Sequence, residues 1–488
     1  MTTPTAEQVI SVAALPQPKR HLLQRVAAYS AARSVTEGLF GIRSIVLATV
    51  LGPVAFGGWA LLRLSMRYAG LGGLGVFRGM ELELMRARGH HAGADDAGDA
   101  AGAALGFVLS VSGTMAALAL IGSFLVRDLQ GAMVLRGFAG AVILEQVYTY
   151  ALIWTRVRTT LRRYATLEIT NAALQAVFTA AFAAVWGLPG AFIGLGCASA
   201  TAILVTSSWV EFRPALRVAP LARLLRVGVP VAISMILGTA LSTGDRWVVA
   251  GFGGAQLLGY YAFAASVAGL AASFAWVVRT VVFPEVYGEA RSIGAAAALN
   301  AHFERAVLPF ARLYPPLLGL LSCLLGPAIA LILPKYLPAV PPARLFLLSG
   351  GAAGLVSLGA LGTVAAGRQR SLPVISGSAL LVTLMLSVLA IRSGAGLEAV
   401  AAASFAGQLI YAGSVLWLNF RESGVPEPGR FLVLALTPLL WSTASALLIG
   451  RLLPGHDLES GLLGAAGYLL LLAPLAPAMM GEWHKVRS

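Results

Sequence analysis

The chain has 488 residues, of which 58% are apolar and only 11% are charged, and its mean hydropathy is +0.81. Because soluble domains carry about 25% charged residues, this composition excludes an ordinary soluble protein. The formal net charge is +14, which would suit a nucleic-acid partner if the basic residues formed one patch. Both cysteines, Cys197 and Cys323, fall in apolar runs, where we interpret them as small apolar fillers.

Apolar runs of about 20 residues recur along the whole chain, and this is the length that crosses a hydrocarbon core about 30 Å thick. Examples are Ala101–Val126, Leu372–Ile391 and Phe431–Ile449. Lipid offers no hydrogen-bond partners, so these runs must be helices. We predict an all-α polytopic membrane protein with about 14 (12–14) spans, namely 30–50, 54–77, 101–126, 131–154, 166–187, 189–210, 227–251, 256–281, 308–333, 342–366, 372–391, 396–418, 431–450 and 460–480.

Basic residues are concentrated in the segments that lie on the N-terminal side of this topology. The opposite side offers only Arg127, Lys335, Arg392 and Arg451. This asymmetry is the positive-inside pattern, which places both termini in the cytoplasm. The net charge therefore reflects topology and attraction to membrane lipids, and no nucleic-acid partner is expected.

The loops are short, so the sequence predicts no folded domain outside the membrane. We expect a cytoplasmic N-terminal segment (1–29), a six-helix bundle (30–210), a linker (211–226) and a second six-helix bundle (227–418). A cytoplasmic loop (419–430), two additional helices (431–480) and a cytoplasmic tail (481–488) complete the chain. The longest expected loops include Arg78–Ala100 and Pro284–Ala306.

An internal repeat relates the two bundles. With an offset of 202 residues the first two spans overlie the seventh and eighth, and the matched pairs are Ala48/Ala250, Gly52/Gly254, Gly57/Gly259, Trp59/Tyr261 and Ala60/Ala262. Each copy has a helix, a short turn marked by glycine, and a helix that bears an aromatic residue. An offset of six spans implies a parallel repeat about an axis normal to the membrane.

The same stretches resemble the Wzx-type polysaccharide flippases. The first runs from Gly41-Ile42-Arg43 to Leu51-Gly52-Pro53 and Phe56-Gly57, and the second runs from Gly228-Val229-Pro230 to Asp245-Arg246-Trp247 and Gly259-Tyr260-Tyr261. Phe283-Pro284-Glu285 is similar to the loop that follows. That superfamily also holds lipid II flippases of the MurJ type and multidrug MATE antiporters. The resemblance implies two six-helix bundles in a V around a central cavity, with two extra C-terminal helices.

Ionisable residues within the spans are the candidate site residues, because a charge at bilayer depth is expensive and marks a pathway or a pair. The 202-residue offset overlays Arg43 on Asp245. We therefore predict that Arg43, Asp245 and Arg246 approach one another at the cavity. Arginine offers planar, bidentate donors to phosphate oxygens, so this trio would hold a diphosphate, and a purely structural pair is the alternative.

Further candidates lie on other spans. Arg136 and the pair Arg63 and Arg67, one helical turn apart, are candidate phosphate ligands, and the pair would otherwise extend to the membrane interface. Ion coupling or sugar contact is expected from Asp245, from Glu145, and from a polar stripe on the fifth span, Glu168, Asn171 and Gln175. This stripe lines either the lumen or a helix interface. We expect no metal or cofactor, and we interpret His90-His91 with Asp95, Asp96 and Asp99 as solvated surface.

The resemblance and the cationic trio together predict a flippase and not an enzyme. It would move a polyprenyl-diphosphate-linked oligosaccharide from the cytoplasmic to the outer leaflet by alternating access, for assembly of a surface polysaccharide. The alternatives are a lipid II flippase and a multidrug or cation antiporter. The expected partners are the lipid-linked oligosaccharide, membrane lipids, and a polysaccharide polymerase with other assembly proteins.

Overall fold

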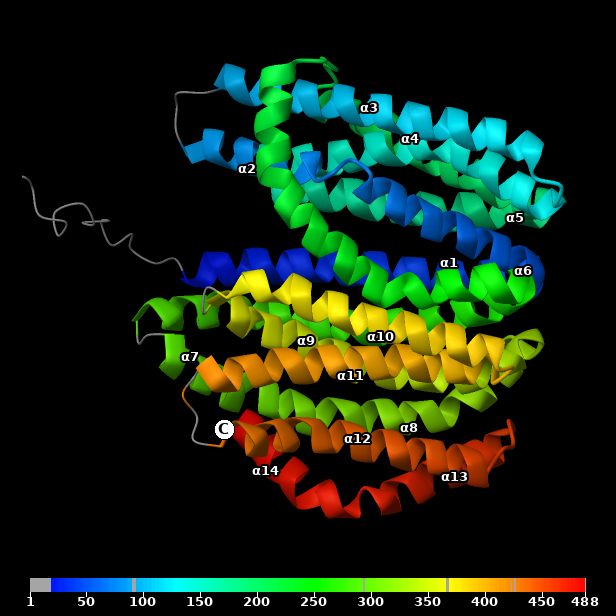
Figure 1. Ribbon diagram of the computed structural model, residues 1–488, viewed down its shortest axis with the longest axis vertical. Coiled ribbons are helices and arrows are strands. Elements are labelled where there is room, and N and C mark those ends of the chain that lie inside the picture. Colours follow the sequence, from blue (N-terminus) through cyan, green and yellow to red (C-terminus); the bar gives the residue numbers. More distant parts are fainter. Residues whose placement is uncertain are drawn as a thin grey trace, which may run out of the picture.

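The computed structural model describes residues 19–89, 94–292, 295–365, 368–422, 424 and 427–487, and within them every regular element is a helix. Figure 1 shows these helices side by side in one bundle, with the start of α1 and the end of α14 on the same face. In chain order they are α1 (Lys19–Leu71), α2 (Val76–Gly89), α3 (Ala94–Leu125), α4 (Leu129–Arg158), α5 (Leu161–Thr206), α6 (Val218–Ser292), α7 (Ala295–His302), α8 (Leu308–Ile332), α9 (Val340–Ala365), α10 (Leu372–Arg392), α11 (Gly396–Glu422), α12 (Pro428–Leu452), α13 (Leu458–Leu471) and α14 (Ala476–Arg487).

Three of these helices are longer than one span because each continues through a kink at a glycine. The kinks lie at Gly52 in α1, Gly187 in α5 and Gly254 in α6, where φ is 70°, 61° and 76°. Only glycine adopts such a φ without steric cost. Figure 1 shows α1 crossing the bundle and returning, so we call the two parts of a kinked helix its first and second arms. Gly52 and Gly254 are partners in the 202-residue repeat, and each marks the turn that the sequence predicted.

The number of spans follows from these kinks. Nine helices of the described residues are long and apolar enough to cross a bilayer, and α13 with the start of α14, bent by 45°, forms a tenth candidate. Counting both arms of the three kinked helices and adding the 30-residue α4 is consistent with the 14 expected spans. The protein is therefore a multi-pass helical membrane protein.

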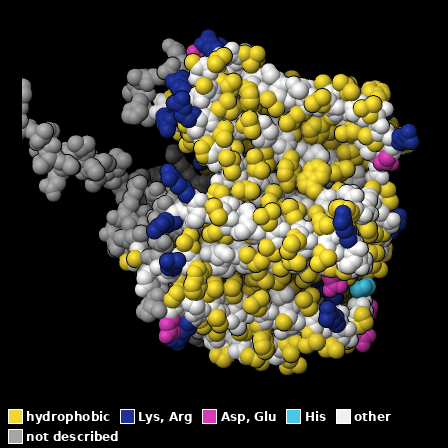
Figure 2. All heavy atoms as spheres, viewed as in Figure 1, with side chains coloured by type: hydrophobic (Ala, Val, Ile, Leu, Met, Phe, Trp, Pro, Cys, Tyr) yellow, Lys and Arg dark blue, Asp and Glu magenta, His cyan; other side chains and the backbone are white. Residues whose placement is uncertain are grey.

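The surface agrees with a lipid environment. Large apolar side chains such as Leu331 and Leu470 are 85% and 76% exposed. Soluble proteins rarely expose wide apolar surfaces of this kind to water. Figure 2 shows apolar side chains across the middle of the molecule and most of the visible Lys and Arg near the face that carries the start of α1. We call this face the terminal face and the opposite one the distal face.

Two segments that the sequence assigned to loops are largely helical. The expected loop Arg78–Ala100 contains most of α2 and the start of α3, and the expected loop Pro284–Ala306 contains the end of α6 and α7. A search for long apolar runs detects only helices that cross the bilayer. It therefore missed these helices, whose sequences mix polar and apolar residues. Residues 1–18 of the expected N-terminal segment lie outside the described residues.

The two halves of the repeat meet along α1 and α6. On the distal side the second arms are so close that a Cβ on Gly57 would meet the carbonyl of Ala255, and one on Gly259 would meet the carbonyl of Pro53. These two contacts are related by the repeat, and we call them the distal contact. An aromatic cluster around Tyr336 lies beside it, with Phe56, Tyr260 and Phe263 at centroid distances of 6.1, 5.9 and 4.7 Å.

On the terminal side the halves meet differently, through α2 and the start of α6. A Cβ on Gly75 would meet the carbonyl of Gly228, and a Cβ on Gly79 would meet the carbonyl of Leu224. Helix α2 is also fixed to α4, because Glu81 accepts from Arg156 at 2.5 Å. The halves therefore touch near both faces of the bundle, and the space between these contacts holds the candidate site.

Outside the spans, helix α13 begins with a capped turn on the distal side. Asp457 accepts hydrogen bonds from the hydroxyl and the backbone N–H of Ser460, at 2.8 and 3.2 Å. These bonds favour the ionised carboxylate and so lower the pKa of Asp457 below its usual value. A cap of this kind fixes where the last span starts.

Candidate functional site

A cavity of about 600 Å³ lies between the two halves. Its walls come from both arms of α1 and α6, with contributions from α4, α9 and α11. The charged residues of the described lining are four arginines and two glutamates, namely Arg43, Arg63, Arg67, Arg246, Glu37 and Glu145. The wall therefore carries a formal excess of positive charge in the interior of a membrane protein.

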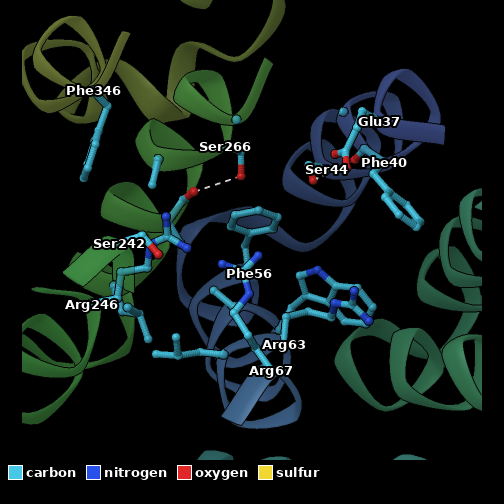
Figure 3. A pocket seen from close by; sticks show the side chains of 18 of the residues that line it. Glu37, Phe40, Ser44, Phe56, Arg63, Arg67, Ser242, Arg246, Ser266 and Phe346 are labelled. Atoms are coloured by element: carbon cyan, nitrogen blue, oxygen red, sulfur yellow. Dashed lines mark hydrogen bonds between the residues drawn. The ribbon is translucent and has the colours of Figure 1, made fainter. Parts of the chain in front are cut away.

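Three of the arginines converge from two helices. Arg63 and Arg67 lie one turn apart on the second arm of α1, and Arg246 extends from the first arm of α6. Figure 3 shows Arg246 beside Ser242 on the α6 side of the cavity, and Arg63 and Arg67 next to Phe56 on the α1 side. Nearby, Tyr68 and Thr243 share a hydrogen bond of 3.0 Å, which joins the same two arms next to Arg67.

Arg43 occupies the first arm of α1 and is only 5% exposed. Its guanidinium donates to the side-chain oxygen of Gln175 on α5 and lies over the rings of Phe40 and Trp59, at 4.6 and 5.5 Å from their centroids. The aromatic faces stabilise the cation where water is scarce. These contacts fix the orientation of Arg43 along the cavity wall.

Glu145 joins this wall to α5. One carboxylate oxygen accepts from the Ser199 hydroxyl at 2.8 Å and from the Gln175 amide at 3.4 Å. The other oxygen lies 4.0 Å from Nη1 of Arg63, within ion-pair range but too far for a hydrogen bond. Gln175 therefore bridges Glu145 and Arg43, and one polar network connects α1, α4 and α5.

Several of these cationic groups retain donors that the protein leaves unused. In the described part of the chain, Nε of Arg43, Nη1 of Arg63 and Nε of Arg246 are buried atoms without a hydrogen-bond partner. Buried donors are nearly always satisfied in native structures, so these three nitrogens are donors of the cavity arginines that lack a protein acceptor.

The expected trio is only partly assembled. Arg43 and Arg246 line the same cavity, whereas Asp245 is fully buried outside the lining. Its carboxylate accepts from the hydroxyl of Tyr261 at 2.7 Å and from the backbone N–H of Arg246 at 2.8 Å. Adjacent residues on a helix point about 100° apart, so Arg246 faces the cavity while Asp245 faces the second arm of its own helix.

Arg136, expected at the cavity, lies elsewhere. Its side chain is exposed on the α3–α4 pair, where Nε is 3.4 Å from the Ser123 hydroxyl and the guanidinium is 5.5 Å from the centre of the Phe124 ring. The reason is helical geometry. Nine residues separate it from Glu145, which is two and a half turns, so the two side chains occupy opposite faces of α4.

The polar stripe of α5 also lies outside the cavity lining. Glu168, Asn171 and Gln175 are 3%, 2% and 2% exposed, which places the stripe at an interface between helices, the alternative that the sequence left open. Gln175 still reaches the site because it contacts Arg43 and Glu145. The stripe therefore supports the cavity wall from behind.

The cavity also contains residues that the sequence analysis did not single out. Glu37 and Phe40 come from α1, Ser266 from α6, Phe346 and Ser349 from α9, and Ser404 and Gln408 from α11. Glu37 and Gln408 had a signal, because each is a strongly polar residue inside an otherwise apolar run. The serines had none, since serine is common in membrane helices.

The sequence analysis also expected no metal site. Among the residues that the structure describes, none group as three or more His, Cys, Asp or Glu side chains that would hold a metal ion. His90 and His91 lie outside the described residues.

Comparison with known proteins gives a likeness of structure alone. No family model and no curated protein matches the sequence. Among solved structures, the lipid II flippase MurJ in an inward closed conformation has a TM-score of 0.68 at 13% identity, covering 93% of this chain and 99% of its own. An inward-facing multidrug MATE transporter of the MOP superfamily has a TM-score of 0.54 at 15% identity, covering 87% and 96%. The MATE transporter VcmN of Vibrio cholerae in a bent form has a TM-score of 0.53 at 16% identity, covering 84% and 99%.

These matches show that the chain has the fold of MOP-superfamily transporters over nearly its whole length. The alignment with MurJ covers a larger share of this chain than the alignment with either MATE structure does. The fold places a central space between two halves of a repeat, which is where the arginine-lined cavity lies.

Proposed function

We propose that this protein is a flippase that moves a polyprenyl-diphosphate-linked oligosaccharide across a bacterial inner membrane. The observation that carries the proposal is the set of four arginines around one cavity between the repeat halves. Guanidinium groups recognise phosphate oxygens through paired donors, and three buried donors here have no protein partner in the described residues. A diphosphate headgroup supplies acceptors of this kind.

The rest of the lining suits the first sugars of such a headgroup. Ser242, Ser266 and Gln408 offer hydroxyl and amide groups, and Phe56 and Phe346 offer aromatic surface. A volume of about 600 Å³ falls within the range of sites for small molecules. It would hold the diphosphate and the adjoining sugars, while the polyprenyl chain stays in lipid.

Two related functions compete with this proposal. A lipid II flippase would use the same headgroup chemistry, and MurJ is the neighbour with the greater overlap. A multidrug or cation antiporter is favoured less, because the wall is positively charged and would repel a cationic substrate. The proposal includes termini in the cytoplasm, gradient coupling, and delivery of the substrate to a polysaccharide polymerase on the outer side.

The test is transbilayer movement of a fluorescent undecaprenyl-diphosphate oligosaccharide in liposomes that contain the purified protein. We expect wild-type protein to move the lipid, and Arg43→Ala and Arg246→Ala each to reduce the rate at least tenfold. Arg136→Ala is the matched control, because that arginine lies within a span but outside the cavity. Equal loss in all three variants, or movement of drugs and small cations instead, would contradict the proposal.

A further inference from the structure

Glu145 is the carboxylate that α4 contributes to the cavity wall, and its two oxygens have different surroundings. Oε1 accepts two hydrogen bonds from neutral groups of α5, the Ser199 hydroxyl and the Gln175 amide. Oε2 faces Arg63 across the cavity edge. One oxygen is therefore anchored to the protein while the other is directed at a cation that also faces the cavity.

The contact with Arg63 is loose. Arginine and carboxylate groups normally pair through hydrogen bonds of about 2.7–2.9 Å, whereas Nη1 of Arg63 lies 4.0 Å from Glu145 Oε2 and makes no hydrogen bond. The ion pair neutralises charge without a hydrogen bond from Nη1. A diphosphate oxygen that enters the cavity would accept a hydrogen bond from Nη1, so it would be a stronger partner for Arg63 than Glu145 is.

A second route connects Glu145 with Arg43. Gln175 accepts from the Arg43 guanidinium with its oxygen and donates to Glu145 with its nitrogen. A change in the charge of Glu145 therefore alters the hydrogen bond that orients Arg43. Through one direct and one bridged contact, the carboxylate acts on two of the four cavity arginines.

We propose that Glu145 is an exchangeable counter-ion, which pairs with Arg63 in the empty cavity and takes up a proton when a diphosphate headgroup replaces it. The proton comes from the aqueous solution and binds Oε2, while Oε1 keeps its bonds to Ser199 and Gln175. When the headgroup leaves, Arg63 recovers its carboxylate partner and the proton is released. Binding of an anion and binding of a proton thus become one coupled event, so the headgroup would cross the membrane with one proton and one negative charge fewer.

The electrostatic surroundings support a group that changes charge with the ligand. The other charged groups that line the cavity with Glu145 are Arg43, Arg63, Arg67 and Glu37 from α1 and Arg246 from α6. Glu168 is buried on the stripe of α5, two helical turns before Gln175. When the arginines are paired with a diphosphate, an ionised Glu145 would lie beside a further anion at membrane depth. Such an arrangement is costly, and one proton relieves it.

This inference rests on the proposed diphosphate substrate, so its test separates the two. Isothermal titration of purified full-length protein with geranyl diphosphate, in two buffers with different ionisation enthalpies, gives both the affinity and the protons taken up. We expect wild-type protein to take up close to one proton more than Glu145→Gln. We also expect Glu145→Gln to bind about tenfold more tightly at neutral pH, because no internal anion competes for Arg63.

Glu459→Gln, an exposed change at the start of α13, is the matched control and should behave as wild type. Equal proton uptake and equal affinity in wild type and Glu145→Gln would overturn the exchange while leaving the flippase proposal intact. Absence of geranyl diphosphate binding by wild-type protein would overturn both.

A measurement on the unmodified protein covers the case in which Glu145→Gln does not fold. Dicyclohexylcarbodiimide reacts with protonated carboxyl groups inside membranes, and mass spectrometry locates the modified residue. We expect labelling of Glu145 to rise severalfold when geranyl diphosphate is added, with labelling of Glu459 unchanged. Labelling of Glu145 that stays constant or falls, at a ligand concentration that saturates the titration, would overturn the proposal.

Discussion

The hydroxyl of Tyr261 donates a hydrogen bond of 2.7 Å to the carboxylate of Asp245, and both side chains are fully buried. The repeat gives this pair a counterpart in the first half, because Arg43 and Trp59 lie 202 residues earlier and form a cation–π contact of 5.5 Å. In both halves an ionisable residue of one arm is stabilised by an aromatic residue of the other. Asp245 of the second half is buried away from the cavity, whereas Arg43 of the first half lines the cavity.

The pair in the second half is therefore expected to contribute to stability. Tyr261→Phe removes a donor from a buried carboxylate, and we expect a loss of about 1–3 kcal/mol of unfolding free energy. The measurement is thermal unfolding of the purified protein. Tyr260→Phe is the matched control, because its hydroxyl accepts only a 3.3 Å bond from the exposed Gln256. Equal melting temperatures for the two variants would show that the Tyr261 bond carries no such role.

The pairing of Asp245 marks a limit of the sequence prediction. The repeat correctly located Gly52 and Gly254 at equivalent turns, because glycine at a reversal is a local backbone requirement. The same offset overlays Arg43 on Asp245, but equivalent positions of two bundles need not face each other. The side-chain direction of Asp245 depends on Tyr261, whose approach is decided by tertiary packing.

Other parts of the site were within reach of the sequence. The spans follow from apolar length, and charges within spans identified Arg43, Arg63, Arg67 and Arg246 as candidates. The position of Arg136 opposite Glu145 follows from helical periodicity, which the sequence analysis did not apply to α4. The network through Gln175 and Ser199 was not predictable, because the two residues come from different arms of α5 and meet only in the folded bundle.

The distal contact should respond sharply to the size of one residue. Gly259→Ala would place a methyl group against the carbonyl of Pro53. This carbonyl belongs to the backbone, so it cannot move aside as the end of a flexible side chain can. We expect this variant to separate the second arms of α1 and α6 on the distal side. With Ser266→Cys as a reporter in a background lacking both native cysteines, labelling by an impermeant maleimide from the distal side should rise at least fivefold.

Gly251→Ala is the control for this experiment, because it lies on the same helix and a Cβ there meets nothing within 4 Å. It should leave the labelling rate of Ser266→Cys unchanged. If Gly259→Ala leaves the labelling rate of Ser266→Cys unchanged as well, the close approach of the two arms does not close the cavity on the distal side.

The bridge between Arg43 and Glu145 predicts a loss of function without removal of any charge. Gln175→Leu deprives the buried guanidinium of its acceptor, so we expect a loss of about 1–3 kcal/mol of unfolding free energy. Transport of the fluorescent lipid should fall about tenfold, because Arg43 is no longer oriented along the wall. Gln256→Leu changes an exposed glutamine and should alter neither quantity. Full transport by Gln175→Leu would show that the orientation of Arg43 does not depend on α5.

An ion pair in a nearly dry environment joins the last helix to the second half. Arg312 of α8 lies 2.5 Å from Glu482 of α14, with side-chain exposures of 21% and 1%. Removing one member of a buried pair leaves an uncompensated charge, which costs about 3–5 kcal/mol, whereas replacing both members by apolar residues costs far less. We therefore expect Glu482→Met to lower the melting temperature more than the double variant Arg312→Met/Glu482→Met does.

This comparison distinguishes charge from packing. If the side chains mattered only for the volume that they fill, the two substitutions would act independently and their effects would add. A coupling between them, measured by thermal unfolding of the two single variants and the double variant, would instead show that the charges depend on each other. Arg451→Met, which changes an exposed arginine at the end of α12, should leave the melting temperature unchanged. Additive losses would mean that α14 is held to α8 by apolar packing, with the ion pair incidental to it.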